Sequence, residues 1–297
     1  MSQIITDKKN LCGSVLIDPS RLRHRRGGLV RVYTSLYTMK LPDEKFAMPK
    51  CLNPASKPSL FCPGCGQSII LKHLGFVIDE MDIKDKVTLG IDIGCSLLAW
   101  DYYNFDIIQT HHGRTTPVIV GYKMARDKRI AIAVMGDGGA YAIGLQSLIH
   151  AAFRNNPITA IVINNTEYSM TGGQMAPTTL PKEITTSSPA GKDEKLFGGA
   201  FYGPELLRQV ARSDAYIARA SVSNPTMLER ILSRAIKSQV EKNNFSFIEI
   251  LSICPTNWKT NARESFEFLT KMEKIYPIGE MTKSSRAKSR DLWEQKK

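Results

Sequence analysis

Five short apolar runs divide the central part of the chain, and their length and β-branched composition predict buried strands. The runs cover residues 86–94, 129–137, 158–165, 214–222 and 245–253. Between them, apolar residues recur every three or four positions over 141–152 and over 227–236, which predicts amphipathic helices. Pro117 and Pro225 lie where prolines are favoured, in the first turn of such helices. Strands that alternate with helices predict an α/β fold, in which a doubly wound, mostly parallel sheet is covered by helices on both faces.

Three segments stand outside this alternation. Residues 1–60 show little periodicity and are interpreted as an N-terminal extension, and residues 256–297 as a C-terminal extension, on either side of an α/β domain at 61–255. Within the domain, residues 171–203 form a long stretch rich in Gly, Pro, Ser and Thr. A connection of that length inside a compact domain is usually functional or disordered.

Length and composition are those of one large domain. The chain has 297 residues, and its 42% hydrophobic content is sufficient for a sizeable core. No apolar run approaches the roughly 20 residues of a membrane-spanning helix, and the first residues lack the apolar core of a signal peptide. These features favour a cytoplasmic protein without membrane contact. In that compartment, six cysteines are more typical of metal ligands or free thiols than of disulfides.

The formal net charge of +12 is concentrated in two runs outside the apolar-periodic centre. They are RLRHRR at 21–26 and the C-terminal segment at 283–297. Basic runs can bind nucleic acid, but no recognition-helix or RNA-binding signature accompanies them. We therefore interpret them as solvated surface, or as arms that lie on an acidic partner, and place nucleic-acid binding last among the candidate functions.

Side chains that can bind a metal or take part in catalysis follow the ends of the predicted strands. Ligands of an open parallel sheet bind beyond the carboxyl ends of its strands. Four predicted strand ends carry thiol, hydroxyl, carboxylate or amide groups, at Cys95-Ser96, Asp137, Asn164-Asn165 and Cys254. Because these ends meet at one edge of a parallel sheet, we expect the four groups to lie close together.

The second of these ends favours a bound metal and phosphate. Asp137 stands in Gly-Asp-Gly-Gly at a predicted strand-to-helix turn, where backbone N–H groups can bind phosphate oxygens. Its carboxylate is a hard oxygen ligand suited to Mg²⁺, and Asn165 adds an amide oxygen from the next strand. Gly-Asp-Gly alone occurs in many tight turns. Followed at this spacing by NNTEYSMTGGQ at 164–174, it is typical of a site for thiamine diphosphate and Mg²⁺.

A second candidate metal site is the cysteine pair in FCPGCG at 61–66. Two cysteines separated by Pro63 and Gly64 form a tight turn that can bind a metal. Taken alone, this spacing is that of half a zinc ribbon, which is favoured over other metal sites.

Several motifs together resemble the β subunit of the 2-oxoacid:ferredoxin oxidoreductases. They are CPGCG at 62–66, IGCS at 93–96, THHGR at 110–114, GDGG at 136–139, NNTEYSMTGGQ at 164–174, and Cys254 after the last predicted strand. The resemblance covers residues 61–280 and implies the thiamine-diphosphate-binding fold. It also implies that Asp137, Asn165 and the backbone carbonyl of Glu167 bind Mg²⁺.

The same resemblance implies a set of cofactor contacts and a cluster. The residues around thiamine diphosphate would be Ile93, Gly94, Cys95, Ser96, His112, Gly138, Gly139, Ser169 and Met170. Those that bind a [4Fe–4S] cluster would be Cys62, Cys65, Cys95 and Cys254. The chemistry agrees, because a zinc ribbon needs a second close pair of ligands, whereas the remaining cysteines stand singly and suit a cluster. Cys12 and Cys51 are expected to be free thiols that bind nothing.

The resemblance also implies an activity. A β subunit of this family takes part in the coenzyme A-dependent oxidative decarboxylation of a 2-oxoacid to acyl-CoA and CO₂, and electrons pass through the cluster to ferredoxin. The glutamate that activates the thiamine comes from a partner subunit in this family, so we assign no catalytic residue in this chain. We expect the chain to be active only with an α subunit, with γ and δ subunits as further candidate partners.

Substrate choice is indicated by Leu97 and Leu98. Members of the family that handle a second carboxylate often have a basic residue here, so the apolar pair favours 2-oxoisovalerate over 2-oxoglutarate. Two alternatives remain. The chain would be the thiamine-binding half of a non-redox 2-oxoacid decarboxylase if it bound no cluster, and a nucleic-acid-binding protein if the basic runs carried its function.

Overall fold

The computed structural model describes residues 48–56 and 59–281, all within one compact unit, Ala47–Lys297. Cys12, both basic runs and most of the expected N-terminal extension lie outside the described residues.

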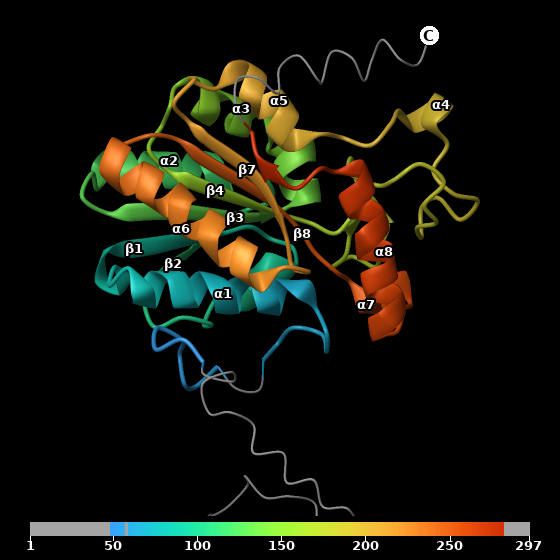
Figure 1. Cartoon of the computed structure of the whole chain (residues 1–297), viewed down its shortest axis with the longest axis horizontal. Coiled ribbons are helices and arrows are strands. Elements are labelled where there is room, and N and C mark those ends of the chain that lie inside the picture. The colour runs from blue at the N-terminus through green and yellow to red at the C-terminus, as the bar shows by residue number, and fades with distance from the viewer. Residues whose placement is uncertain (1–47, 57–58, 282–297) are drawn as a thin grey trace, which may run out of the picture. The chain divides into compact units, whose positions relative to one another are not determined.

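One seven-stranded sheet runs through the described residues, with the strand order β2-β1-β3-β4-β8-β7-β9. Its strands are β1 (Val87–Ile91), β2 (Asp106–Gln109), β3 (Ile130–Gly136), β4 (Thr159–Asn164), β7 (Tyr216–Ser221), β8 (Ser246–Leu251) and β9 (Gly279–Glu280). Every neighbouring pair is parallel except β7 with β9. The mostly parallel sheet predicted from the alternation is confirmed, and the five apolar runs are β1, β3, β4, β7 and β8 (Figure 1).

The central strands are apolar because both of their faces are covered. All residues of β1, β4 and β8 are buried, whereas the edge strand β2 is partly exposed along its whole length. A strand buried on both faces reads as a continuous apolar run rather than as an alternation.

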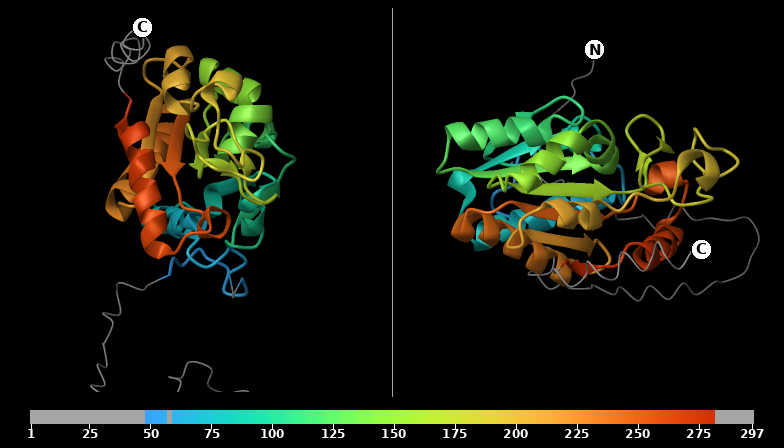
Figure 2. Two further views of the ribbon diagram at one scale, coloured as in Figure 1. Left: turned by 90° about the vertical axis from the view of Figure 1, so that its right-hand side faces the viewer. Right: turned by 90° about the horizontal axis from the view of Figure 1, so that it is seen from above.

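Helices cover both faces of the sheet (Figure 2). On one face, α1 (Gly66–Glu80) packs against α6 (Pro225–Lys242). On the other, α2 (Thr115–Ala125), α3 (Leu145–Phe153) and α5 (Gly203–Val210) pack in series. Two hydrophobic clusters, one on each face, form the core.

The remaining elements are short, apart from one helix. They are η2 (Lys84–Lys86), η3 (Cys95–Ala99), the π-helical turn η4 (Gly139–Ile143), α4 (Glu194–Phe197), α7 (Pro255–Trp258), the longer α8 (Ala262–Ile275), and the antiparallel pair β5 (Glu167–Tyr168) and β6 (Gln174–Met175). No helix among the residues described combines the length and apolar character needed to cross a membrane.

Helices α6 and α8 begin with side-chain caps. The side chain of Asn224 accepts a hydrogen bond from the backbone N–H of Met227, and Pro225 occupies the first turn of α6, as predicted. Pro117 likewise lies in the first turn of α2. Asn261 and Glu264 form a capping box at the start of α8.

Helix α8 lies within 256–297, where a C-terminal extension was expected. Its Leu269 and Met272 are buried in the same hydrophobic cluster as α1 and α6, and Tyr276, at its end, is also fully buried there. This part of the chain thereby contributes side chains to the core of the sheet domain.

Candidate functional site

The candidate site lies at the carboxyl edge of the sheet, where four neighbouring strands end. Strands β1, β3, β4 and β8 are adjacent in that order. The residues that follow them are Asp92 to Cys95, Asp137 to Gly139, Asn165 to Glu167, and Ser252 to Cys254. The parallel arrangement therefore brings these segments to one edge, as the strand-end argument predicted.

Asp137 is buried, and hydrogen bonds hold both of its carboxylate oxygens. Oδ1 accepts the backbone N–H of Gly138 at 2.9 Å, and Oδ2 accepts the hydroxyl of Thr178. Burial raises the pKa of Asp137 to about 7. The two hydrogen bonds oppose this rise, and the carboxylates of Glu249 and Glu167 add to it.

Two further carboxyl groups share this environment. Burial raises the pKa of Glu167 to about 7 and that of Glu183 to about 8, and Asp137 and Glu167 add to the rise at Glu183. Glu183 accepts the hydroxyl of Thr166 at 2.6 Å and the N–H of Leu180 at 2.7 Å. Two buried acids, Asp137 and Glu167, and the half-buried Glu183 thus lie in an environment that disfavours their charged forms and that a divalent cation would stabilise.

The amide of Asn165 is oriented by Ser169. Its Nδ2 donates to Ser169 Oγ at 2.5 Å, so the oxygen is the amide atom available to a cation. Across the described ranges, no three His, Cys, Asp or Glu side chains are grouped to hold one metal ion. The ligand set expected for Mg²⁺ needs no such group, because it takes one carboxylate, one amide oxygen and one backbone carbonyl.

The glycines after β3 leave no room for side chains. A Cβ at Gly138 would collide with the ring of Tyr168, and one at Gly139 would collide with Oδ2 of Asp92. Gly113, at a φ of 64°, packs against the same turn, since a Cβ there would collide with Ile143. The THHGR and GDGG segments therefore meet, and their backbones can approach a phosphate closely.

Asp92 is a site residue that the sequence reasoning missed. Its Oδ1 accepts the N–H of Gly113 at 2.8 Å and the hydroxyl of Thr115 at 3.3 Å, while Oδ2 is buried without a hydrogen-bond partner. Burial raises its pKa to about 6, against the effects of these donors and of the nearby His112. The sequence feature that could have revealed Asp92 is that an acid stands near the end of the otherwise apolar run at 86–94. Glu183 and Thr178 gave no comparable signal, because they lie inside the long 171–203 segment.

The cysteine pair and the end of β8 lie side by side. The N–H of Cys65 bonds the carbonyl of Cys62 at 3.0 Å, and Gly66 N–H donates to the carbonyl of Ile253 at 3.0 Å. That last bond places the first turn of α1 next to Cys254.

Cys95 is affected by the charges of this cysteine pair, and both Cys95 and Cys254 are affected by that of Glu167. Burial raises the pKa of Cys95 to about 12, and Cys65, Cys62 and Glu167 add to the rise. Burial also raises the pKa of Cys254 to about 12, and its thiol contacts Glu167. All four cysteines are free thiols at one edge of the sheet. A four-iron cluster takes one thiolate on each iron, so its ligands are spaced more widely than those of a single ion.

Cys51 lies away from the four cysteines at the edge of the sheet. Its buried thiol donates to the carbonyl of Gly75 at 3.4 Å, within α1 and toward the end opposite the cysteine pair. Its pKa is raised to about 12 by burial and by Asp79.

The other predicted contacts surround the same edge. Gly94, with a φ of 139°, precedes η3, in which buried Ser96 donates to Gln67 at 3.4 Å. Ile93 is half-buried, and His112 and Met170 are exposed. Leu97 and Leu98 are half-buried on η3.

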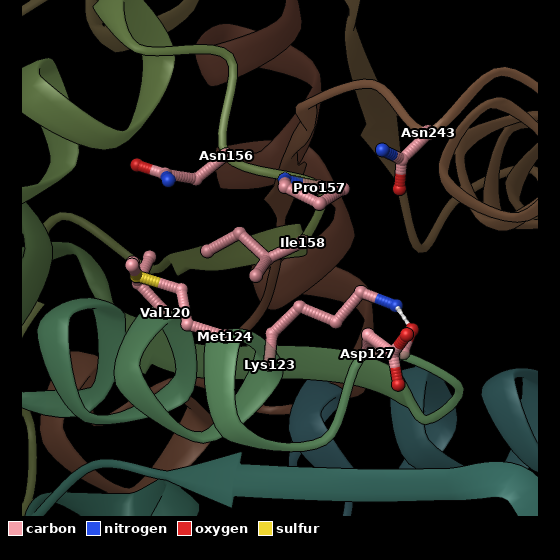
Figure 3. Close-up of a pocket in the computed structure, with 8 residues that line it drawn as sticks. All are labelled: Val120, Lys123, Met124, Asp127, Asn156, Pro157, Ile158 and Asn243. Carbon is pink, nitrogen blue, oxygen red and sulfur yellow. Dashed lines mark hydrogen bonds between the residues drawn. The ribbon is translucent and has the colours of Figure 1, made fainter.

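A pocket elsewhere on the molecule does not bring together buried acids and cysteines. It lies between the end of α2 and the segment before β4 (Figure 3). Its lysine, Lys123, donates to the backbone carbonyls of Asp127 and Arg129. The carboxyl edge of the sheet is therefore the better candidate site.

The chain is similar to known proteins over most of its length. Residues 92–250 match the family described as thiamine pyrophosphate enzyme, C-terminal TPP binding domain. The ketoisovalerate oxidoreductase subunit VorA of Methanothermobacter thermautotrophicus is 36% identical over 222 residues, which are 73% of this chain and 46% of that protein. The chain thus spans about half the length of this relative.

Two further relatives are matched over most of their own length. The 2-oxoglutarate synthase subunit KorB of Archaeoglobus fulgidus is 34% identical over 212 residues, 71% of this chain and 76% of that protein. Among solved structures, the 2-oxoglutarate:ferredoxin oxidoreductase from Magnetococcus marinus superposes with a TM-score of 0.65 at 26% identity. The match covers 75% of this chain and 72% of that one.

Proposed function

This chain belongs to the 2-oxoacid:ferredoxin oxidoreductase subunit family, and we propose that it is the thiamine-diphosphate-binding β subunit of a coenzyme A-dependent member. The complex would convert a 2-oxoacid to acyl-CoA and CO₂ and pass the electrons to ferredoxin. The observation that carries this proposal is the meeting of buried Asp137 and four free cysteines at one edge of the sheet.

In the proposed cofactor site, Asp137, Asn165 and the backbone carbonyl of Glu167 bind Mg²⁺. Support comes from the buried carboxyl groups of Asp137 and Glu167, because burial raises their pKa values and a bound cation would offset the cost of burying their charged forms. The backbone of Gly138 and Gly139 would receive the diphosphate, since neither position has space for a side chain.

The remaining contacts would come from segments on either side of that turn. They are Ile93, Gly94, Cys95, Ser96, His112, Ser169 and Met170. When bound, thiamine diphosphate supplies the nucleophilic carbon that cleaves a 2-oxoacid beside its carbonyl group. The chain itself would orient the diphosphate and exclude water from the buried acids, and Cys95 would contact the cofactor.

The proposed cluster site consists of Cys62, Cys65, Cys95 and Cys254. Burial raises the pKa of Cys95 and Cys254 to about 12, so the metal-free thiols stay protonated at neutral pH. Iron would stabilise the thiolate forms through its positive charge. A [4Fe–4S] cluster there would give electrons a route away from the cofactor.

A partner subunit completes the proposed site. The glutamate that activates thiamine is proposed to come from an α subunit, as the family resemblance implies. The chain's own donors already hold Asp137, Glu167 and Glu183, and one oxygen of Asp92. Relatives of this chain are named as subunits. The solved relative is described with coenzyme A and succinyl-CoA bound, which supports coenzyme A as the acyl acceptor.

Leu97 and Leu98 support a branched aliphatic substrate, 2-oxoisovalerate. They are half-buried beside Cys95, where an apolar side chain of the substrate would find apolar contacts. The relative named for ketoisovalerate agrees with this choice.

The test is reconstitution under anaerobic conditions. The chain is purified alone and with co-expressed partners, iron, sulfide and thiamine are measured, and viologen reduction is followed with 2-oxoisovalerate and with 2-oxoglutarate. We expect turnover only with the partner, and faster turnover with 2-oxoisovalerate. Release of CO₂ without dye reduction would favour the non-redox decarboxylase, and 2-oxoacid oxidation by the chain alone would contradict the shared site.

A further inference from the structure

Thr178 reaches the candidate cation site from the long 171–203 segment. It is fully buried, and its hydroxyl donates to Oδ2 of Asp137. Because Oδ1 already accepts the N–H of Gly138, both oxygens of the carboxylate are held by donors, and its plane is fixed. An ionised carboxylate has about four acceptor positions, so two of them remain for a cation.

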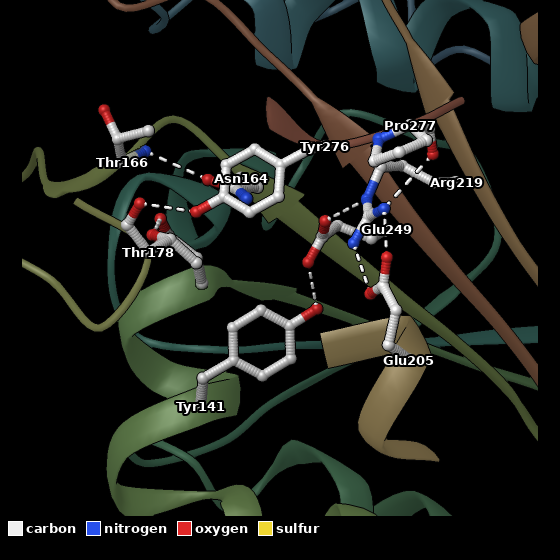
Figure 4. A network of polar contacts seen from close by, with 10 residues as sticks. Tyr141, Asn164, Thr166, Thr178, Glu205, Arg219, Glu249, Tyr276 and Pro277 are labelled. Atoms are coloured by element: carbon white, nitrogen blue, oxygen red, sulfur yellow. Dashed lines mark hydrogen bonds and ion pairs between the residues drawn. The ribbon is translucent and has the colours of Figure 1, made fainter. Parts of the chain in front are cut away.

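Thr178 is itself held by a buried tyrosine. The hydroxyl of Tyr276 donates to the carbonyl oxygen of Thr178 at 2.7 Å (Figure 4). Tyr276 follows α8 and is fully buried, and the guanidinium of Arg219 lies over its ring at 5.2 Å from the ring centroid. The position of Thr178 is thus set by the core of the domain, although it lies in a long irregular segment.

The network around Arg219 also holds the glycine turn. Arg219 Nε donates to Glu249 at 2.6 Å, and its two terminal nitrogens donate to Glu205 at 2.7 Å each. The second oxygen of Glu249 accepts the hydroxyl of Tyr141, which lies in the π-helical turn that begins at Gly139. One buried network therefore supports both Asp137 contacts, from the segment side through Tyr276 and from the turn side through Tyr141.

We infer that Thr178 is a positioning residue for Asp137, which directs the free acceptor positions of the carboxylate toward the bound cation. The inference rests on the proposed function, in which Asp137 binds Mg²⁺. A hydroxyl that donates to a ligand carboxylate fixes its orientation without contacting the metal. Loss of such a partner typically lowers metal affinity by about 10–100-fold.

The test compares three variants of the full chain. Thr178→Val removes the hydroxyl and keeps the shape, and Thr178→Ser keeps the hydroxyl. Thr185→Val is the matched control, because Thr185 is also buried in the same segment, and its hydroxyl bonds Ser188 at 2.7 Å, away from Asp137. Calorimetry gives the Mg²⁺ concentration that half-saturates thiamine diphosphate binding, and circular dichroism gives the unfolding midpoint without metal.

We expect Thr178→Val to raise the half-saturating Mg²⁺ concentration by about 10–100-fold, and Thr178→Ser and Thr185→Val to remain close to the unmodified chain. An unchanged Thr178→Val, or an equal loss in either of the other two variants, would overturn the positioning role. If the unmodified chain itself showed no Mg²⁺-dependent binding, the proposed function would fall together with this inference. Failure of the proposed function would thus be seen in the unmodified chain, whereas failure of the positioning role would be seen only in the variants.

Discussion

Replacing Arg219 with methionine should destabilise the domain far more than the same change at an exposed ion pair. Arg219 is 0% exposed and bonds Glu249, also 0% exposed, and Glu205, which is 23% exposed. Removing the guanidinium leaves the carboxylate of Glu249 buried with only the hydroxyl of Tyr141 as a donor. Breaking a buried ion pair from one side typically lowers the free energy of unfolding by about 3–5 kcal/mol.

The control is Arg263→Met. Arg263 pairs with Glu267 one helical turn away, and the side chains are 88% and 58% exposed. Such a pair contributes about 0.3–0.5 kcal/mol. Urea denaturation with linear extrapolation measures both losses. Arg219→Lys should recover only part of the loss, because an ammonium cannot serve two carboxylates through a planar fork.

The reasoning would be refuted if Arg219→Met lowered the free energy of unfolding by less than about 1 kcal/mol, the range of an exposed pair. Equal losses in the Arg219 and Arg263 variants would refute it as well. Either result would mean that the ion pairs of the buried network contribute little to the free energy of unfolding beyond the packing of their side chains.

Three further predictions concern the site. Asp137→Ala should abolish Mg²⁺-dependent binding of thiamine diphosphate in calorimetry, and near-normal affinity would contradict the cation assignment. Cys254→Ser should lower the iron content of the anaerobically purified protein, whereas Cys51→Ser should leave it unchanged. Burial raises the pKa of Asp137 and Glu167 to about 7 and that of Glu183 to about 8, above the value of about 4 expected for these groups in an unfolded chain. The metal-free folded chain therefore binds more protons than the unfolded one in this interval, so its free energy of unfolding should fall as pH rises from about 4 to about 8. Thermal stabilisation by Mg²⁺ should grow between pH 6 and pH 8, and a constant stabilisation would contradict the role of these acids.

The sequence was sufficient to predict the buried strands but not the edges of the sheet. Strands β1, β3, β4, β7 and β8 were visible because strands covered on both faces are continuous apolar runs. Strand β2 is half-exposed and β9 has two residues, so neither produces such a run. Helix α8 has a clear apolar face, but it follows the last predicted strand, and only its contacts reveal that it belongs to the core.

The spacing of the motifs in the sequence predicted which segments form the candidate site, but not the contacts between those segments. Asp137 and Asn165 follow the adjacent strands β3 and β4, as was expected from the sequence, although the full order of the strands was not predicted. The hydrogen bond from Thr178 to Asp137 depends on how a long irregular segment folds back, and no local rule specifies that path. The metal ligands and the cluster cysteines remain predictions.

The bond between Gly66 and Ile253 has a consequence for biosynthesis. It joins the start of α1 to the segment after β8, and the two segments pack closely, since a Cβ at Gly66 would collide with Ser252. A ribosome releases the chain from its N-terminus, so Cys62 and Cys65 emerge long before Cys254. Strand β8 also inserts between β4 and β7, a pairing of distant segments that closes slowly. A cluster held by all four thiols can therefore be inserted only after nearly the whole domain has been translated, and a nascent chain that met iron earlier would offer it an incomplete set of ligands.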